Sequence, residues 1–140
     1  MNKMDQFGQI MSQASHLYGH WAKQKGINYN YLAIFHSLVR LTACPQKQIC
    51  TLWALPKQTV SMACQKLYAD GLIDYVPAEN DKREKLLILT AQGKALAEPI
   101  VAELDEVEQQ ILDRFGDARA QFLLNELSEL QMLLQQNLVK

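Results

Sequence analysis

The chain has few of the residues that mark secreted, metal-stabilised or membrane-spanning proteins. Its 140 residues include only three cysteines, an odd number with no Cys-x-x-Cys pair, which argues against a disulfide framework and a structural zinc site. The longest apolar runs are a few residues, too short to span a bilayer. The opening Met-Asn-Lys-Met-Asp-Gln lacks the apolar core of a signal peptide. We therefore expect a cytoplasmic protein with no membrane partner.

The motifs of common enzyme classes are also missing. There is no phosphate-binding loop, no Ser/His/Asp arrangement with recognisable spacing, and no pair of acidic residues in a candidate cleft. We expect neither an enzyme nor a bound cofactor.

A large basic excess is missing too, since the formal net charge is −1. The charge is unevenly distributed, however. Residues 40–85 carry seven basic groups against five acidic ones, whereas residues 86–140 carry four basic groups against nine acidic ones. The basic segment is modest for one chain, and a two-fold dimer would double it.

That basic segment contains a helix followed by a hairpin. The pattern predicts a helix over 56–70 that ends at a glycine, strands over 72–76 and 85–89, and a charged tip over 77–84. A short helix with a turn precedes the first of these elements. A helix that can enter a groove, beside a basic loop that can reach phosphate, is typical of a winged helix-turn-helix.

Amphipathic helices flank this module. Apolar residues recur at helical spacing from Phe7 to Trp21, so that helix must bury one face. Asn28 is suited to cap a second helix and Thr90 a long one that runs to Phe115. Pro99 lies inside the long helix and should kink it or restart it near Glu98.

The last helix has a stripe of large apolar residues, more than one small domain can cover, which suggests a second copy of the chain as partner. The stripe consists of Phe122, Leu123, Leu127, Leu130, Leu134 and Leu138. The expected fold is thus mainly α with a small β-hairpin wing, in a single chain over 1–140. The DNA-binding lobe would span 28–93, and residues 1–27 and 94–140 would form dimerisation helices.

The sequence resembles the MarR family of bacterial transcription regulators. Asp81-Lys82-Arg83, followed by Leu87-Ile88-Leu89-Thr90-Ala91-Gln92-Gly93, is similar to the family's wing signature of Asp-x-Arg, a strand and Leu-Thr-x-x-Gly. Thr59-Val60-Ser61 and Leu67 with Gly71-Leu72-Ile73 resemble the recognition helix and its exit. The match covers about residues 45–95. Two positions depart from the pattern: Met62 stands where many relatives carry arginine, and Ala54 where the turn often has glycine.

The resemblance implies a homodimer that sets two recognition helices on a pseudo-palindrome. Arg83 would enter the minor groove, oriented by an ion pair with Asp81. The alternative for this tip is a solvated charged turn, and for the helix an exposed polar face. The side chains expected to contact DNA are Lys57, Gln58, Thr59, Ser61, Gln65, Lys82 and Arg83.

Three kinds of signal remain open. His16 and His20 have the spacing of a metal pair but no obvious third ligand, so we expect no metal. Cys44, before Pro45, is the best redox candidate, because Cys50 and Cys64 occupy inward helix positions. A small, mainly apolar and often aromatic anion could bind a crevice, or the same residues could be core. That crevice would be lined by Tyr18, Trp21, Tyr31, Phe35 and His36.

The leading hypothesis is therefore a homodimeric DNA-binding repressor that a ligand or a stress signal releases. The alternative is a winged-helix module that docks on protein without sequence-specific DNA binding, which the low total charge favours. Steep salt dependence of duplex binding would separate the two.

Overall fold

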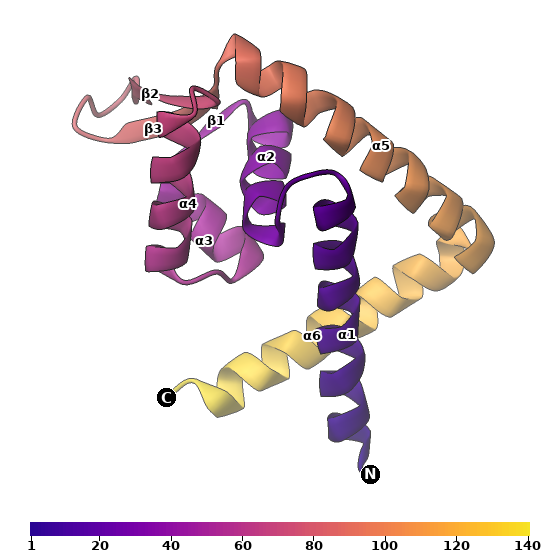
Figure 1. Ribbon diagram of the computed structural model, residues 1–140. Helices are drawn as coiled ribbons and strands as arrows, with labels where there is room; N and C mark the ends of the chain where they lie inside the picture. The colour runs from indigo at the N-terminus through magenta and orange to yellow at the C-terminus, as the bar shows by residue number, and fades with distance from the viewer. The chain divides into compact units, whose positions relative to one another are not determined.

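The computed structural model describes residues 1–140 as six helices and a three-stranded antiparallel sheet (Figure 1). This mainly helical fold with a hairpin wing confirms the predicted fold class. None of the helices has the length and apolar character that a membrane span requires. The helices are α1 (Lys3–Gln24), α2 (Tyr29–Leu41), α3 (Gln46–Trp53), α4 (Lys57–Ala69), α5 (Ala91–Phe115) and α6 (Asp117–Leu138), and the strands are β1 (Ala43–Cys44), β2 (Ile73–Pro77) and β3 (Lys85–Leu89).

The chain divides into two compact units, Met1–Val101 and Ala102–Lys140. The first contains α1 to α4, the sheet and the beginning of α5, whereas the second contains the rest of α5 and α6. The predicted division into a lobe over 28–93 and dimerisation helices on either side remains a prediction.

Polar caps set the starts of the first two helices. The Asn2 side chain accepts a hydrogen bond from the Asp5 backbone N–H at 2.7 Å, and the Asp5 carboxylate accepts one from the Asn2 N–H at 3.4 Å. This capping box starts α1 four residues before the Phe7 from which the apolar pattern was read. Asn28 caps α2 as predicted, since its side chain accepts from the Tyr31 N–H at 2.8 Å.

The core of the first unit forms around α2. Buried residues of α2 meet α3, α4 and the sheet in one apolar cluster that includes Phe35, Ile49, Leu67 and Leu87. Burying a side chain of this size contributes about 1.5 to 3 kcal/mol. The cluster therefore holds α4 and the wing in one rigid arrangement.

Ser37 is the one buried polar residue, and both of its hydrogen-bonding roles are filled. Its hydroxyl donates to the Ala33 carbonyl at 2.7 Å and accepts from the Trp53 indole N–H at 2.9 Å. This chain of bonds ties the end of α3 to α2.

The sheet has the order β1-β3-β2, so β3 pairs on both edges. In the hairpin, Ile73 lies opposite Leu89 and Pro77 opposite Lys85. Strand β1 was not predicted from the sequence, because a two-residue strand leaves no periodic pattern. It exists by pairing with β3, more than forty residues away in the chain.

Helix α5 runs without interruption through Pro99, so the restart near Glu98 does not occur. Proline removes one backbone donor. The helix tolerates that loss because Ala97, Ile100 and Val101, on either side of the proline, are buried.

The apolar face predicted on α1 is not buried within the chain. Ala22 is the only buried residue of α1, and Ala120 the only one of α6. Several large side chains on each helix are exposed, among them Ile10, Leu17, Phe122, Leu123, Leu124 and Leu133.

Candidate nucleic-acid interface

A tight turn sets the angle between α3 and α4. Ala54 adopts the left-handed conformation, with φ 52° and ψ 45°, and its N–H donates to the Cys50 carbonyl. The Leu55 N–H also donates to that carbonyl, at 3.1 Å. The two bonds close the end of α3, and the chain then enters α4 directly at Pro56.

Helix α4 has one apolar face and one polar face. Val60, Ala63, Cys64 and Leu67 are buried against the core, at the i, i+3, i+4, i+7 spacing of one helix face. Of the predicted DNA contacts on this helix, Lys57, Gln58 and Gln65 are exposed, and Thr59 and Ser61 are half-buried. All five lie on one helix, and no acidic residue lies between Lys57 and Ala69.

The start of α4 adds a feature that sequence reasoning missed. Pro56 is the N-cap residue and supplies no side-chain cap, so no side chain accepts from the first-turn amides of α4. Those donors and the helix dipole favour an anion at this end. The signal was in the sequence, as a proline where helices usually carry Ser, Thr, Asn or Asp.

A recess of about 310 Å³ joins α4 to the start of α2. Its lining includes Met62 and Thr59 from α4, together with Asn28, Asn30 and Tyr31. Asn30 was not predicted to belong to this surface, because only the packing of α2 against α4 brings it beside that helix.

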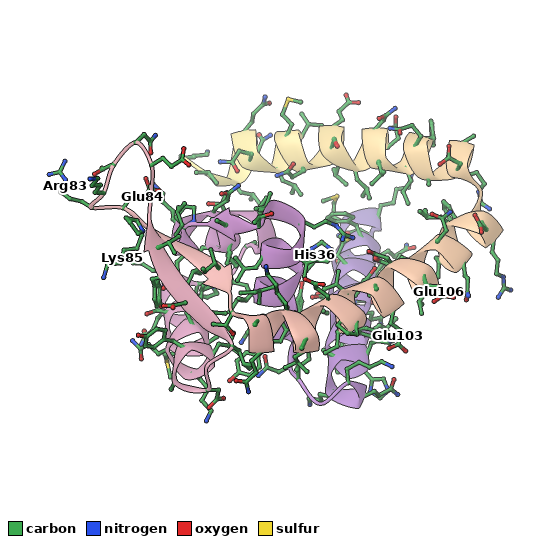
Figure 2. The ribbon with its side chains drawn as sticks, turned by 90° about the horizontal axis from the view of Figure 1, so that it is seen from above. His36, Arg83, Glu84, Lys85, Glu103 and Glu106 are labelled. Atoms are coloured by element: carbon green, nitrogen blue, oxygen red, sulfur yellow. The ribbon has the colours of Figure 1, made fainter.

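The wing tip presents Arg83 to solvent. The Ala78 N–H donates to the Glu84 carbonyl at 2.9 Å, which closes the loop beyond the two strands. Asp81 Oδ1 accepts from the Arg83 backbone N–H at 3.0 Å and lies 3.5 Å from Arg83 Nε. The Arg83 side chain is 94% exposed and points away from the sheet in Figure 2.

The ion pair foreseen between Asp81 and Arg83 is therefore present. Because both side chains are exposed, it contributes little to stability. Its effect is local, since the bond to the backbone shapes the turn from which the arginine projects. Lys82, between the two, is exposed as well.

The Leu-Thr-x-x-Gly segment fastens the base of the wing to the exit of α4. The Thr90 hydroxyl donates to the Gly71 carbonyl at 2.6 Å and accepts from the Gly93 N–H at 3.0 Å. The Thr90 N–H donates to the Leu72 carbonyl at 3.1 Å. A Cβ at Gly93 would overlap the Leu72 carbonyl oxygen, which explains why this position requires glycine.

The cysteines are protected thiols. Cys44 lies in β1 rather than in a loop, is only 1% exposed, and has a pKa raised by burial. Burial, with smaller effects of the nearby Cys50 and Cys44, raises the pKa of Cys64 to about 12. Thiolate formation at neutral pH is therefore disfavoured at both sites. Cys50 is half-buried.

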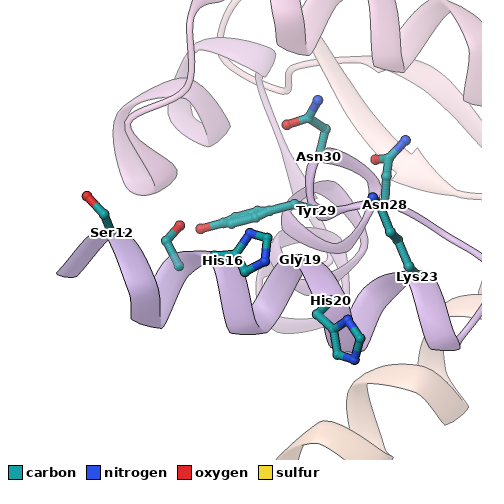
Figure 3. A pocket seen from close by; sticks show the side chains of 9 residues that line it. Ser12, His16, Gly19, His20, Lys23, Asn28, Tyr29 and Asn30 are labelled. Carbon is teal, nitrogen blue, oxygen red and sulfur yellow. The ribbon is translucent and has the colours of Figure 1, made fainter. Parts of the chain in front are cut away.

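His16 and His20 border a wide recess of about 700 Å³ between α1 and the start of α2. Figure 3 shows the His16 ring beside Tyr29, whereas the His20 ring points elsewhere. His20 Nε2 lies 3.3 Å from the Gln24 amide. No three or more His, Cys, Asp or Glu side chains are grouped to hold a metal ion.

The residues predicted to line a ligand crevice have different surroundings. Phe35 is fully buried in the core, and the Tyr31 ring packs at 6.4 Å from it. The Trp21 ring lies 5.3 Å from Lys25 Nζ, and Tyr18 is exposed. His36 packs edge-on against Trp53, with 5.3 Å between ring centroids. A recess of about 270 Å³ is lined there by His36, Ser37, Arg40, Leu41, Leu52 and Trp53.

Comparison with known proteins agrees with this geometry. The model of the MarR family matches residues 25–84. NMB1585, a MarR family regulator from Neisseria meningitidis, is 35% identical, with a TM-score of 0.89 and coverage of 99% of this chain and 97% of that one. A search of curated proteins found no match.

Two more distant structures show likeness of fold alone. A mutant of MarR from E. coli, complexed with operator DNA, is 16% identical over 91% of this chain and 92% of that one, with a TM-score of 0.70. BpsR from Bordetella bronchiseptica, whose DNA binding is regulated by 6-hydroxynicotinic acid, is 20% identical over 90% and 98%, with a TM-score of 0.69.

Proposed function

Because the chain belongs to the MarR family of transcription regulators, we propose that it is a repressor that binds a pseudo-palindromic operator as a homodimer and is released by a signal. The observation that carries the proposal is the surface of α4 and the wing. It combines a helix without acidic residues from Lys57 to Ala69 with an arginine that projects from a turn.

On this proposal α4 lies in the major groove. Gln58, Ser61 and Gln65 read base edges, while Lys57, Thr59 and the uncapped amides at the helix start contact phosphate. Lys82 and Arg83 reach the flanking minor groove and phosphates, with Asp81 shaping the turn. Because the shared core holds α4 and the wing, one protomer engages both grooves at a fixed separation.

The apolar surface that the chain leaves uncovered supports the proposed homodimer. Large side chains on α1 and α6 are exposed in the single chain, and burying them against a second copy would remove that surface from water. Two copies also double the basic surface, which compensates for the low charge of one chain.

The recess beside Trp53 is the proposed site for a releasing ligand. Leu41, Leu52 and Trp53 supply apolar walls, and Arg40 and His36 lie on its border. This combination suits a small aromatic acid, the class that includes the 6-hydroxynicotinic acid of BpsR. A ligand there would shift the spacing of the two recognition helices away from one turn of DNA.

Selection from a random duplex pool tests the proposal. We expect enriched duplexes with two inverted half-sites centred about 10 base pairs apart. Affinity should fall steeply with salt, by roughly 0.9 in log K per log salt for each phosphate neutralised. Failure to enrich any sequence, together with salt-insensitive binding, would favour the protein-interaction module instead.

A further inference from the structure

Met62 is an apolar side chain on the outer face of α4, beside the polar Gln58 and Gln65. It is 62% exposed and lies one turn from Gln58 on one side and Gln65 on the other. The core does not need it, because α4 buries a separate set of residues on its opposite face. The recess that it shares with Asn30 and Tyr31 leaves this flexible side chain room to change rotamer.

The chemistry of the major groove decides what such a side chain can read. Guanine and adenine present hydrogen-bonding groups there, and a thioether facing them leaves those groups desolvated without a strong partner. Thymine alone presents a C5 methyl group, and cytosine has only a hydrogen at that carbon. An apolar group at this position therefore both favours thymine and disfavours purines.

We propose that Met62 is a specificity-determining residue that selects a thymine in each half-site through contact between its side chain and the C5 methyl of the base. This inference rests on the proposed function, in which α4 enters the major groove. It adds that one base of the operator is read without a hydrogen bond.

Replacing single thymines of the selected operator by deoxyuridine tests the contact, because this substitution removes the methyl and keeps every hydrogen-bonding group. With the full-length wild-type chain, one thymine per half-site should be sensitive. Loss of its methyl should weaken binding about fourfold, from roughly 0.8 kcal/mol per carbon. Changing both half-sites together should weaken it about fifteenfold.

Two variants identify the residue responsible. Met62→Ala should bind the thymine and deoxyuridine duplexes equally, and it should fold normally because the side chain is exposed. Gln65→Ala, on the same face, should bind more weakly overall yet keep the fourfold difference. Thermal unfolding of both variants checks that the fold is retained.

The inference is overturned if the wild type is indifferent to deoxyuridine at every thymine of the half-site, or if the sensitivity persists in Met62→Ala. Either result would leave the proposed function standing. If the chain enriches no duplex at all, the proposed function and this inference fall together.

Discussion

At the scale of single residues, the side chains that hold the wing in place differ from the side chains proposed to contact DNA. Thr90 and Gly93 lie at the base of the wing and fasten it to the exit of α4. Arg83, at the far end of the wing, bonds only locally to Asp81. Substitutions at the two ends should therefore affect different measurements.

Arg83→Ala should weaken operator binding by roughly 1 to 3 kcal/mol and leave thermal stability unchanged, because the side chain is exposed. Arg83→Lys should weaken operator binding less than Arg83→Ala does, since lysine keeps the charge but lacks the planar guanidinium group. The measurement is a mobility shift at fixed salt. Arg114→Ala removes the same charge from an exposed position at the end of α5, outside α4 and the wing, and should bind normally. Unchanged affinity in Arg83→Ala would contradict the wing contact.

Gly93→Ala should lower the free energy of unfolding by about 1 to 3 kcal/mol, because the added methyl overlaps the Leu72 carbonyl oxygen. Gly8→Ala is the matched control. Nothing lies within 4 Å of the added Cβ there, so a helical alanine should stabilise α1 by roughly 0.5 to 1 kcal/mol. Urea unfolding measures both, and equal effects at the two glycines would refute the steric explanation.

The thiols should react in order of accessibility. Alkylation of the folded protein at pH 8 should label Cys50 before Cys44 and Cys64, because burial raises the pKa of the latter two. Burial also raises the pKa of Cys64 from 9.0 to about 12 on folding. Burial of the neutral Cys64 thiol therefore stabilises the folded chain fully below pH 9, and this contribution is lost as the pH rises to 12. Mass spectrometry of labelled peptides gives the order in which the thiols are alkylated. Labelling of Cys44 before Cys50 would contradict its protection and would favour Cys44 as a redox sensor.

At the scale of elements, the turn between α3 and α4 sets the angle at which α4 leaves α3. Ala54 holds that turn in a left-handed conformation that costs an alanine more than a glycine. Ala54 is therefore strained at a position where members of the MarR family often have glycine. The shared core on both sides of the turn keeps the angle in place.

Ala54→Gly should raise the free energy of unfolding by roughly 0.5 to 1 kcal/mol, because relief of the strain exceeds the added flexibility of the unfolded chain. Ala95→Gly, at an exposed position inside α5, should have the opposite sign and cost about 1 kcal/mol. Denaturant unfolding compares the two. A destabilised Ala54→Gly would show that the turn is not strained.

At the scale of the whole molecule, the exposed apolar faces of α1 and α6 connect stability with function. A monomer would present a single α4 helix and a modest positive charge to DNA, whereas a dimer would place two α4 helices on one operator. We expect light scattering to give a mass of about 32 kDa, twice the 16.0 kDa of the chain.

The double variant Leu17→Glu with Leu123→Glu should be monomeric and lose operator binding, because it places charges on both faces. Leu52→Glu in α3 is the control for assembly, since Leu52 is also an exposed leucine but lies outside α1 and α6. Because Leu52 lines the recess beside Trp53, this control is measured without ligand. A wild-type monomer, or a double variant that still dimerises, would contradict the proposed assembly.

Much of the interface could be predicted because its signals are local. Gly71 after a helical pattern, Asn28 before one, and the Asp81 to Arg83 tip between two strands each specify structure within a few residues. What was missed depends on distant partners. Strand β1 forms only against β3, and the amide of Asn30 borders α4 only because α2 packs there.

The amino-acid sequence alone thus determined the family, the helices and the wing, because caps, glycines and apolar spacing act over one or two turns of chain. The tertiary structure decided what those elements expose. It buried Cys44, left α1 and α6 without apolar cover, and set Met62 on the outer face of α4. Exposure depends on which surfaces pack together, and those contacts join residues far apart in the chain.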